Sequence, residues 1–249
     1  MCTVTYLPYR DGFILTHNRD EAPARSPQHL SREQRGHNTL LFPKDTKAGG
    51  SWIACSRRGQ TACLLNGAFL KHAHLPPYRK SRGLVLLEFF DWASPDAFFD
   101  HYALEGIEPF TFLFFQPGQV TEFRWDGSAR HRKDLSPDQP HFWCSATLYP
   151  PAMQARREQL FQRWLQQQQI RFPETRPRLS AAVRQLHHTG SIGDPENDYV
   201  MNRGGRVCTV SISQIVVTNE HLRMRYHDLL EGRRNTRTMR WTRDTAKKT

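Results

Sequence analysis

A chain of 249 residues can bury a sizeable core, so its folding requires neither disulfides nor a structural metal. The five cysteines are odd in number and form no CxxC pair, which argues against a disulfide framework or a zinc site and favours the reducing cytoplasm. A formal charge of +11 allows an anionic ligand or an acidic membrane surface, but no base-stacking or groove-binding motif accompanies it, so we expect no nucleic-acid partner.

Strands are predicted where β-branched and aromatic residues gather between turn residues. They cover residues 2–7, 13–17, 51–56, 60–66, 110–116, 119–125, 141–147, 206–218 and 221–227. Helices are predicted over residues 82–92, from an N-cap at Ser94, over 151–168 and over 178–188. This order of strands and helices predicts an α+β sandwich in which helices cover largely antiparallel sheets.

Two segments fall outside these elements. Residues 21–50, rich in Pro, Arg, Ser and Gly, are predicted to form one long loop, and long loops within a domain are often functional. Residues 231–249 are basic and lack apolar periodicity, so we expect a single domain over residues 1–230 followed by a flexible, solvated tail. No secretory signal and no transmembrane segment are predicted, because no apolar stretch is long enough.

Cys2 directly follows the initiator Met. Met is normally removed when the next residue is small, and the mature chain would then begin with Cys2. An α-amine has a pKa of roughly 8 and a thiol one of about 8.5, so part of the amine is free base at neutral pH. It could take the thiol proton directly or through one water, which would make Cys2 a nucleophile with its own base. The other interpretation is a small cysteine buried on a strand.

A polar string, His17-Asn18-Arg19-Asp20-Glu21, ends the second predicted strand. Because side chains alternate along a strand, Arg19 and Asp20 point to opposite faces. An Asp near a terminal ammonium would orient it, while an Arg would favour the thiolate or bind a substrate carboxylate. The alternative is an ion-pair cluster at the end of a surface strand.

Two further features have a chemical interpretation. The pair Gly49-Gly50 before a strand permits close approach of another backbone segment. Asn66 closes an apolar strand, where its amide could donate to a developing oxyanion. The sequence Asn66-Gly67 is also typical of an ordinary turn.

The stretches MCTVTYL, GFILTHNRDE, AGGSWIA and GQTACLLNGAF together resemble the NRDE family, also called the transport-and-Golgi-organisation family. The resemblance covers residues 1–70 and returns at residues 201–203 and 206–211. That family in turn resembles the N-terminal-nucleophile amidases of the bile salt hydrolase and penicillin V acylase type. The resemblance therefore implies a four-layer αββα sandwich.

The resemblance also implies roles for individual residues. Cys2 would be the nucleophile, Asp20 the partner of its amine, Arg19 the nearby cation and Asn66 an oxyanion donor. Substrate-binding roles are implied for three residues: Asn18, Arg203 and Arg206. No metal ligand is implied.

One departure from the amidase pattern concerns the oxyanion hole. Where the amidases have a second Asn, this chain has Cys144-Ser145-Ala146-Thr147, so Ser145 or Thr147 would have to serve. Losing one such donor can lower the rate by about 10²–10³.

Two functions remain open. The first is a Cys2-dependent hydrolase or acyltransferase that acts on an amide or thioester of a small acyl substrate with an anionic end and needs no cofactor. The second is a non-catalytic protein that binds and traffics haem, or an acyl-CoA or lipid, in the same cleft, because a fold does not fix a function.

Overall fold

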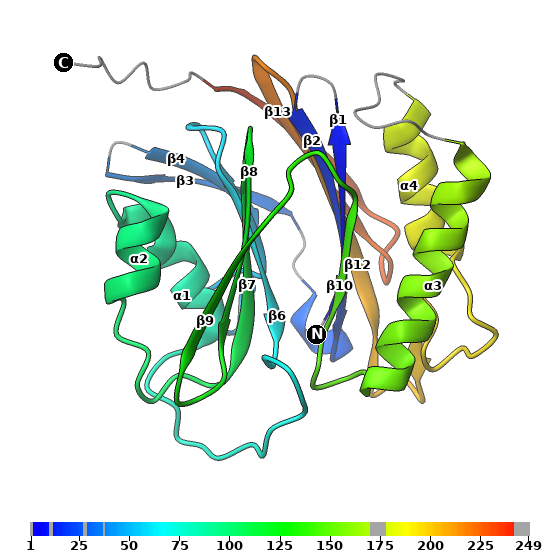
Figure 1. The fold of residues 1–249 in the computed structure, drawn as a ribbon, viewed down its shortest axis with the longest axis horizontal. Helices are drawn as coiled ribbons and strands as arrows, with labels where there is room; N and C mark the ends of the chain where they lie inside the picture. Colours follow the sequence, from blue (N-terminus) through cyan, green and yellow to red (C-terminus); the bar gives the residue numbers. More distant parts are fainter. Residues whose placement is uncertain (1, 10–11, 27–28, 37, 170–177, 242–249) are drawn as a thin grey trace.

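The computed structural model describes residues 2–9, 12–26, 29–36, 38–169 and 178–241. Within these residues, two antiparallel sheets stack face to face between two layers of helices (Figure 1). The four layers confirm the predicted αββα sandwich and its mixed α+β class.

The first sheet contains both ends of the described chain. Its seven strands are β1 (Cys2–Tyr9), β2 (Gly12–Glu21), β10 (His141–Cys144), β11 (Asn202–Arg203), β12 (Val207–Val217), β13 (His221–Asp228) and β14 (Arg234–Arg240). Their order is β10-β1-β2-β12-β13-β14, with β11 paired to β12. Because both faces of the sheet are covered, β1, β2 and β12 are buried along nearly their whole length.

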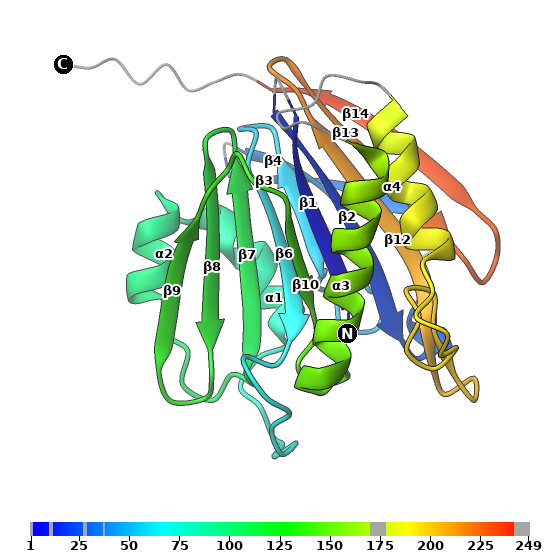
Figure 2. The same ribbon diagram turned by 45° about the vertical axis from the view of Figure 1, so that its right-hand side comes forward.

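The second sheet is a meander in which every strand pairs with its neighbour in sequence. Its seven strands are β3 (Leu30–Arg35), β4 (Asn38–Pro43), β5 (Ile53–Ser56), β6 (Thr61–Asn66), β7 (Phe110–Gln116), β8 (Gln119–Trp125) and β9 (Arg130–Leu135). Figure 2 shows β6 to β9 side by side at one end of this sheet. The strand patterns and Gly-containing turns predicted the β5–β6 and β7–β8 hairpins of this sheet correctly.

Helices cover the outer face of each sheet (Figure 1). The second sheet is covered by α1 (Arg82–Glu88), the short η2 (Phe89–Asp91) and α2 (Pro95–His101); the first is covered by α3 (Pro151–Gln168) and α4 (Arg178–Thr189). A further short helix, η1 (Pro23–Arg25), follows β2. Ser94 caps α2 as predicted, because its hydroxyl accepts a hydrogen bond from the Ala97 backbone N–H at 3.1 Å.

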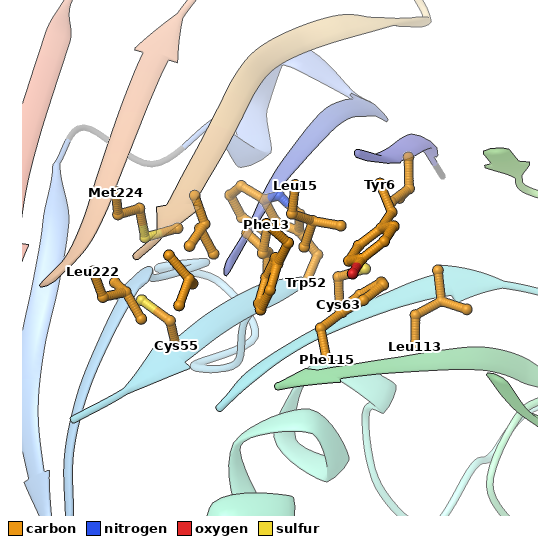
Figure 3. Close-up of a cluster of buried hydrophobic side chains, with 14 of the residues drawn as sticks. Tyr6, Phe13, Leu15, Trp52, Cys55, Cys63, Leu113, Phe115, Leu222 and Met224 are labelled. Carbon is orange, nitrogen blue, oxygen red and sulfur yellow. The ribbon is translucent and has the colours of Figure 1, made fainter. Parts of the chain in front are cut away.

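The apolar layer between the two sheets determines where a site can form. Figure 3 shows side chains from both sheets meeting there, among them Tyr6, Phe13 and Phe115. The centroid of the Tyr6 ring lies 5.5 Å from those of Phe13 and Phe115. Cys2 and Trp52 belong to the same layer, so the residue predicted to be the nucleophile lies between the sheets rather than on an outer face.

The structure corrects two predictions about irregular segments. Residues 21–50 are not one long loop, because they contain η1 and the β3–β4 hairpin. The expected flexible tail is wrong over Arg234–Arg240, which forms β14; residues 242–249 lie outside the described residues. Strands β3, β9 and β14 lie at sheet edges, where backbone pairing on one side suffices and charged side chains face outward. This explains why apolar periodicity did not reveal them.

The predicted close backbone approach occurs at Gly50. A Cβ atom there would lie 2.4 Å from the carbonyl carbon of Gly83 at the start of α1. The Ser51 backbone N–H donates to the Gly83 carbonyl oxygen at 3.1 Å, which fixes this contact. A Cβ atom added at Gly49 would have no non-neighbouring atom of the described residues within 4 Å, and only the positive φ of 71° disfavours a side chain there.

We therefore predict that Gly50→Ala lowers the free energy of unfolding by about 3 kcal/mol, because backbone must move to admit the methyl group. Gly49→Ala is the matched control and should lower it by about 1 kcal/mol through φ strain alone. Urea unfolding of both variants measures the difference. Equal losses would contradict the proposed contact between Gly50 and Gly83.

Candidate functional site

A cavity of about 400 Å³ opens where β1 and β2 meet the end of β6 and the start of α1. It is lined mainly by polar and charged residues, with one cysteine among them. The lining residues are Cys2, Arg19, Glu21, Arg25, Asp45, Ala48, Gly50, Ser51, Trp52, Leu64, Asn66, Tyr78, Lys80, Ser81, Arg82, Gly83 and Glu108. Three of the four residues predicted as catalytic, Cys2, Arg19 and Asn66, are therefore brought together.

Cys2 and Arg19 are direct cross-strand partners in the β1–β2 pair, so their side chains share one face of the sheet. Cys2 is 1% exposed. Burial raises the pKa of its thiol to about 11; the Asp20 carboxylate acts in the same direction, and the Arg19 guanidinium opposes it. The thiol is therefore neutral at pH 7, and a nucleophilic role would require a base beside it.

Arg19 is held rigidly in the wall of the cavity. Its guanidinium carbon lies 3.9 Å from the centroid of the Trp52 ring. Its Nη2 donates to Asp45 Oδ2 at 2.7 Å, and its Nη1 donates to the Arg25 carbonyl oxygen at 2.6 Å. Since the side chains of Arg19 and Asp45 are 4% and 5% exposed, this is a nearly dry ion pair.

Glu21 is a cavity residue that our sequence analysis did not select. It lies two residues beyond Arg19 on β2 and so shares its face, and its Oε2 lies 3.1 Å from Arg25 Nη1. Burial would raise its pKa, but the α-ammonium at the chain terminus, the Ala22 backbone N–H and the guanidinium groups of Arg25 and Arg19 hold the pKa below its usual value. The alternation used to separate Arg19 from Asp20 could have identified Glu21.

Asp20 lies on the opposite face of β2, toward α3, and does not line the cavity. Its Oδ2 accepts from the Tyr149 hydroxyl at 2.8 Å, and its Oδ1 accepts from the Thr209 hydroxyl at 2.7 Å. Burial raises the pKa of Asp20, while the Arg157 guanidinium and the two hydroxyl donors oppose that rise. In this arrangement Asp20 supports β2 from behind the cavity.

Asn18 also faces away from the cavity, toward α4. Its Nδ2 donates to the carbonyl oxygens of His187 and Tyr199 at 2.9 and 2.8 Å. Its Oδ1 accepts from His187 Nδ1 at 2.6 Å, so His187 Nε2 is the acceptor for the Thr5 hydroxyl at 2.8 Å. These contacts give Asn18 a structural role, and the structure does not bring it to a substrate.

Asn66 reaches the cavity from the second sheet. Among the described residues its side-chain amide has no hydrogen-bond partner, which leaves it available to a ligand. Its carbonyl oxygen accepts from the Ser145 hydroxyl at 2.8 Å, and the Ser145 N–H donates to the Cys2 carbonyl oxygen at 3.0 Å. Ser145 therefore connects the backbones of Cys2 and Asn66, whereas neither Ser145 nor Thr147 lines the cavity.

Arg203 and Arg206, the two arginines near the start of β12, do not line the cavity. Arg203 Nη2 donates to Asn197 Oδ1 at 2.6 Å and to the Leu148 carbonyl oxygen at 3.2 Å. Arg206 is exposed in the turn before β12. The predicted substrate-binding roles of Arg203 and Arg206 thus have no counterpart in the lining of this cavity.

The described part of the chain offers no group of three His, Cys, Asp or Glu residues placed to hold a metal ion. All five cysteines are free thiols. Nor does any helix within the described ranges combine the length and apolar character that crossing a bilayer requires.

The Arg19–Asp45 pair yields a prediction on stability. Asp45→Asn should lower the free energy of unfolding at pH 7 by about 3 kcal/mol, because it leaves Arg19 buried beside a neutral partner. Although burial acts to raise the pKa of Asp45, the N–H groups of Ala48 and Lys47 and the guanidinium groups of Arg19 and Arg25 hold it below its usual value.

A depressed carboxyl pKa contributes stability above the unfolded-state pKa of about 4 and loses it as the pH falls further. The gap between wild type and Asp45→Asn should therefore shrink below about pH 4 in urea titrations. Glu33→Gln, which removes an exposed 2.8 Å ion pair with Lys44, is the control and should change stability by less than about 1 kcal/mol. A pH-independent gap for Asp45→Asn would contradict the assignment.

Comparison with known proteins finds solved structures of similar fold. The fold is similar to two solved structures of conjugated bile acid hydrolase from Clostridium perfringens, at 10% identity with TM-scores of 0.53 and 0.51. The first match covers 98% of both chains, and the second covers 97% of both. It is also similar to the Caenorhabditis elegans N-acylethanolamine-hydrolyzing acid amidase orthologue, at 12% identity and a TM-score of 0.50 over 86% of this chain and 92% of that one.

At these identities the likeness establishes the fold, which is that of N-terminal-nucleophile hydrolases. No curated protein shows a significant sequence match. A family model described as Transport and Golgi organisation 2 matches residues 1–227. The chain therefore belongs to the Transport and Golgi organisation 2 family.

Proposed function

We propose that this protein is a cysteine-dependent acyl hydrolase or acyltransferase that acts on an amide or thioester of a small acyl substrate. The observation that carries the proposal is the side-by-side placement of Cys2 and Arg19 in a cavity that Asn66 also lines. The solved structures of similar fold are, by their printed names, a conjugated bile acid hydrolase and an N-acylethanolamine-hydrolyzing acid amidase, which favours an acyl-transfer reaction.

The nucleophile would be the Cys2 thiol of a chain from which Met1 has been removed. The freed α-amine takes the thiol proton, and the sulfur forms a bond to the substrate carbonyl carbon. Collapse of the tetrahedral intermediate breaks the bond to the leaving amine or thiol, which receives that proton. Water activated by the same amine then releases the acyl group from Cys2.

Glu21 is the carboxylate suited to orient that amine, because it faces the cavity with Cys2 and its lowered pKa keeps it ionised at neutral pH. Arg19 cannot supply a proton, and its role would be to favour the thiolate electrostatically. The predicted role of Asp20 becomes indirect, since its carboxylate is hydrogen-bonded on the opposite face.

Asn66 would donate its free amide to the oxyanion, together with a backbone N–H. Basic side chains at the cavity wall, Arg25, Lys80 and Arg82, suit an acyl substrate with an anionic end. Each already contacts a carboxylate, so such a substrate would compete with Asp45, Glu88 or Glu108 for them.

The test is a panel of acyl amides and acyl thioesters read by the mass of the acyl-enzyme. Met1-free protein should gain one acyl group on the Cys2 peptide and turn the substrate over. Cys2→Ala should lose both, whereas Cys208→Ser, outside the cavity, should retain them. An unmodified Cys2 across the whole panel together with saturable haem or acyl-CoA binding would favour the alternative, a non-catalytic carrier that uses the same cavity.

A second prediction concerns the oxyanion donor. Asn66→Ala should lower kcat by about 10²–10³ with little change in KM, since the lost hydrogen bond forms in the transition state. Ser145→Ala tests the other residue near this position. Because the Ser145 hydroxyl is engaged by the Asn66 carbonyl, its loss should lower kcat far less. A larger effect for Ser145 than for Asn66 would reverse the assignment.

A further inference from the structure

A second cavity, of about 420 Å³, lies between α4 and the β13–β14 face of the first sheet. It shares no residue with the cavity at Cys2 and lies on the other face of that sheet. Its lining residues are Ala181, Arg184, Gln185, His188, Ile212, Gln214, Arg225, Tyr226, His227, Arg234, Asn235 and Thr236.

All of the charged side chains among the described lining residues of this second cavity are cationic. The described lining contains three arginines and two histidines and no Asp or Glu. Within the described residues, Arg184, Arg225 and Arg234 make no ion pair with a carboxylate, unlike the arginines at the Cys2 cavity. Burial and the neighbouring Arg225 and Arg223 lower the pKa of Arg184, which reflects unbalanced positive charge.

Sheet register and hydrogen bonds hold the cations in place. His227 pairs with Arg234 across β13 and β14, so both point to the α4 side. Arg184 Nη1 donates to Gln214 Oε1 at 2.6 Å and to the Ser180 hydroxyl at 2.8 Å, which anchors α4 to β12. The positive groups are therefore positioned by contacts that do not neutralise them.

The two histidines form a coupled pair. His227 Nδ1 lies 3.2 Å from His188 Nε2, and Arg234 Nε donates toward His227 Nε2 at 3.5 Å. His227 thus accepts at Nε2 and donates from Nδ1, which is the neutral form of the ring. Burial, His227, Arg234 and Arg184 lower the pKa of His188. Burial and Arg234 lower that of His227, against the opposing Asp228.

We propose that this cavity between α4 and β13–β14 binds a phosphate-bearing small anion. A phosphate carries a charge of about −1.5 to −2 and several acceptor oxygens, so one group can neutralise two guanidinium groups. The planar guanidinium fork binds two oxygens at once. A phosphate has enough oxygens to bind two arginines in this way, whereas a single carboxylate can bind only one. The proposal is independent of the reaction at Cys2.

Binding of an anion here would also be coupled to proton uptake by the two histidines. An anion would offset the repulsion from neighbouring cations, which adds to burial in lowering the pKa of His188 and His227, so both would become easier to protonate. For an anion whose own charge stays constant, binding should therefore strengthen as the pH falls from 8 to 6. The charged groups that face the pair are Arg184 on α4, Arg225 and Asp228 on β13 and Arg234 on β14.

The test is isothermal titration calorimetry of the full chain with pyrophosphate. Arg225→Gln should weaken binding about tenfold or more. Arg237→Gln is the matched control, since Arg237 lies exposed on β14 outside the cavity and should leave the affinity unchanged. Urea unfolding of both variants checks that each is folded. If the two variants weaken binding equally, or wild type binds no pyrophosphate, the proposal is overturned.

Two further arms refine the result. Sulfate keeps its charge between pH 6 and 8, so its affinity should rise at pH 6 in wild type and stay flat in a His188→Gln, His227→Gln variant. A flat wild-type profile would contradict the proton coupling.

Vesicles of phosphatidylcholine with and without phosphatidic acid distinguish the source of the phosphate. Binding to free pyrophosphate alone indicates a soluble ligand, and Arg225-dependent vesicle binding indicates a lipid headgroup.

Discussion

The pairing of Cys2 with Arg19 across β1 and β2 is the constraint on which the site depends. Because side chains alternate along a strand, this one register sends Arg19 and Glu21 into the space between the sheets with Cys2. It sends Asn18 and Asp20 to the opposite face, against the helices. A shift by one residue would exchange the two sets and remove both charges from the cavity.

Each set has a separate physical role. On the cavity side, the charge of Arg19 is balanced by Asp45 and covered by the Trp52 ring, so a cation persists in an almost dry wall. On the helix side, Asn18 donates to the His187 carbonyl oxygen on α4 and accepts from His187 Nδ1. Asp20 accepts from Tyr149, just before α3, and from Thr209 on β12, and these bonds hold β2 in position. The polar string therefore has two faces: Arg19 and Glu21 line the cavity, and Asn18 and Asp20 hold the strand in place from the opposite side.

The sequence predicted the fold well, because its hairpins and helices carry strong apolar periodicity and Gly-containing turns. It missed β3, β4, β9 and β14. The pairing of β3, β9 and β14 relies on backbone groups and their side chains are mostly polar, whereas the apolar β4 lies within the Pro- and Gly-rich segment that was expected to be a loop. For the site, position along the chain selected Cys2, Arg19 and Asn66, which the structure brings to one cavity. It could not foresee that Arg203 is tied to Asn197 or that Asp45, far along the chain, balances Arg19, since such contacts arise only from tertiary packing.

The central claim is that Cys2 acts through its own α-amine inside this cavity. The most direct measurement compares protein freed of Met1 with protein made to retain it, each treated with an acyl β-lactone and read by intact mass and peptide mapping. We expect one acyl group on Cys2 of the Met1-free protein and little or none on the protein that retains Met1. Equal acylation of both forms, or acylation of neither, would contradict it.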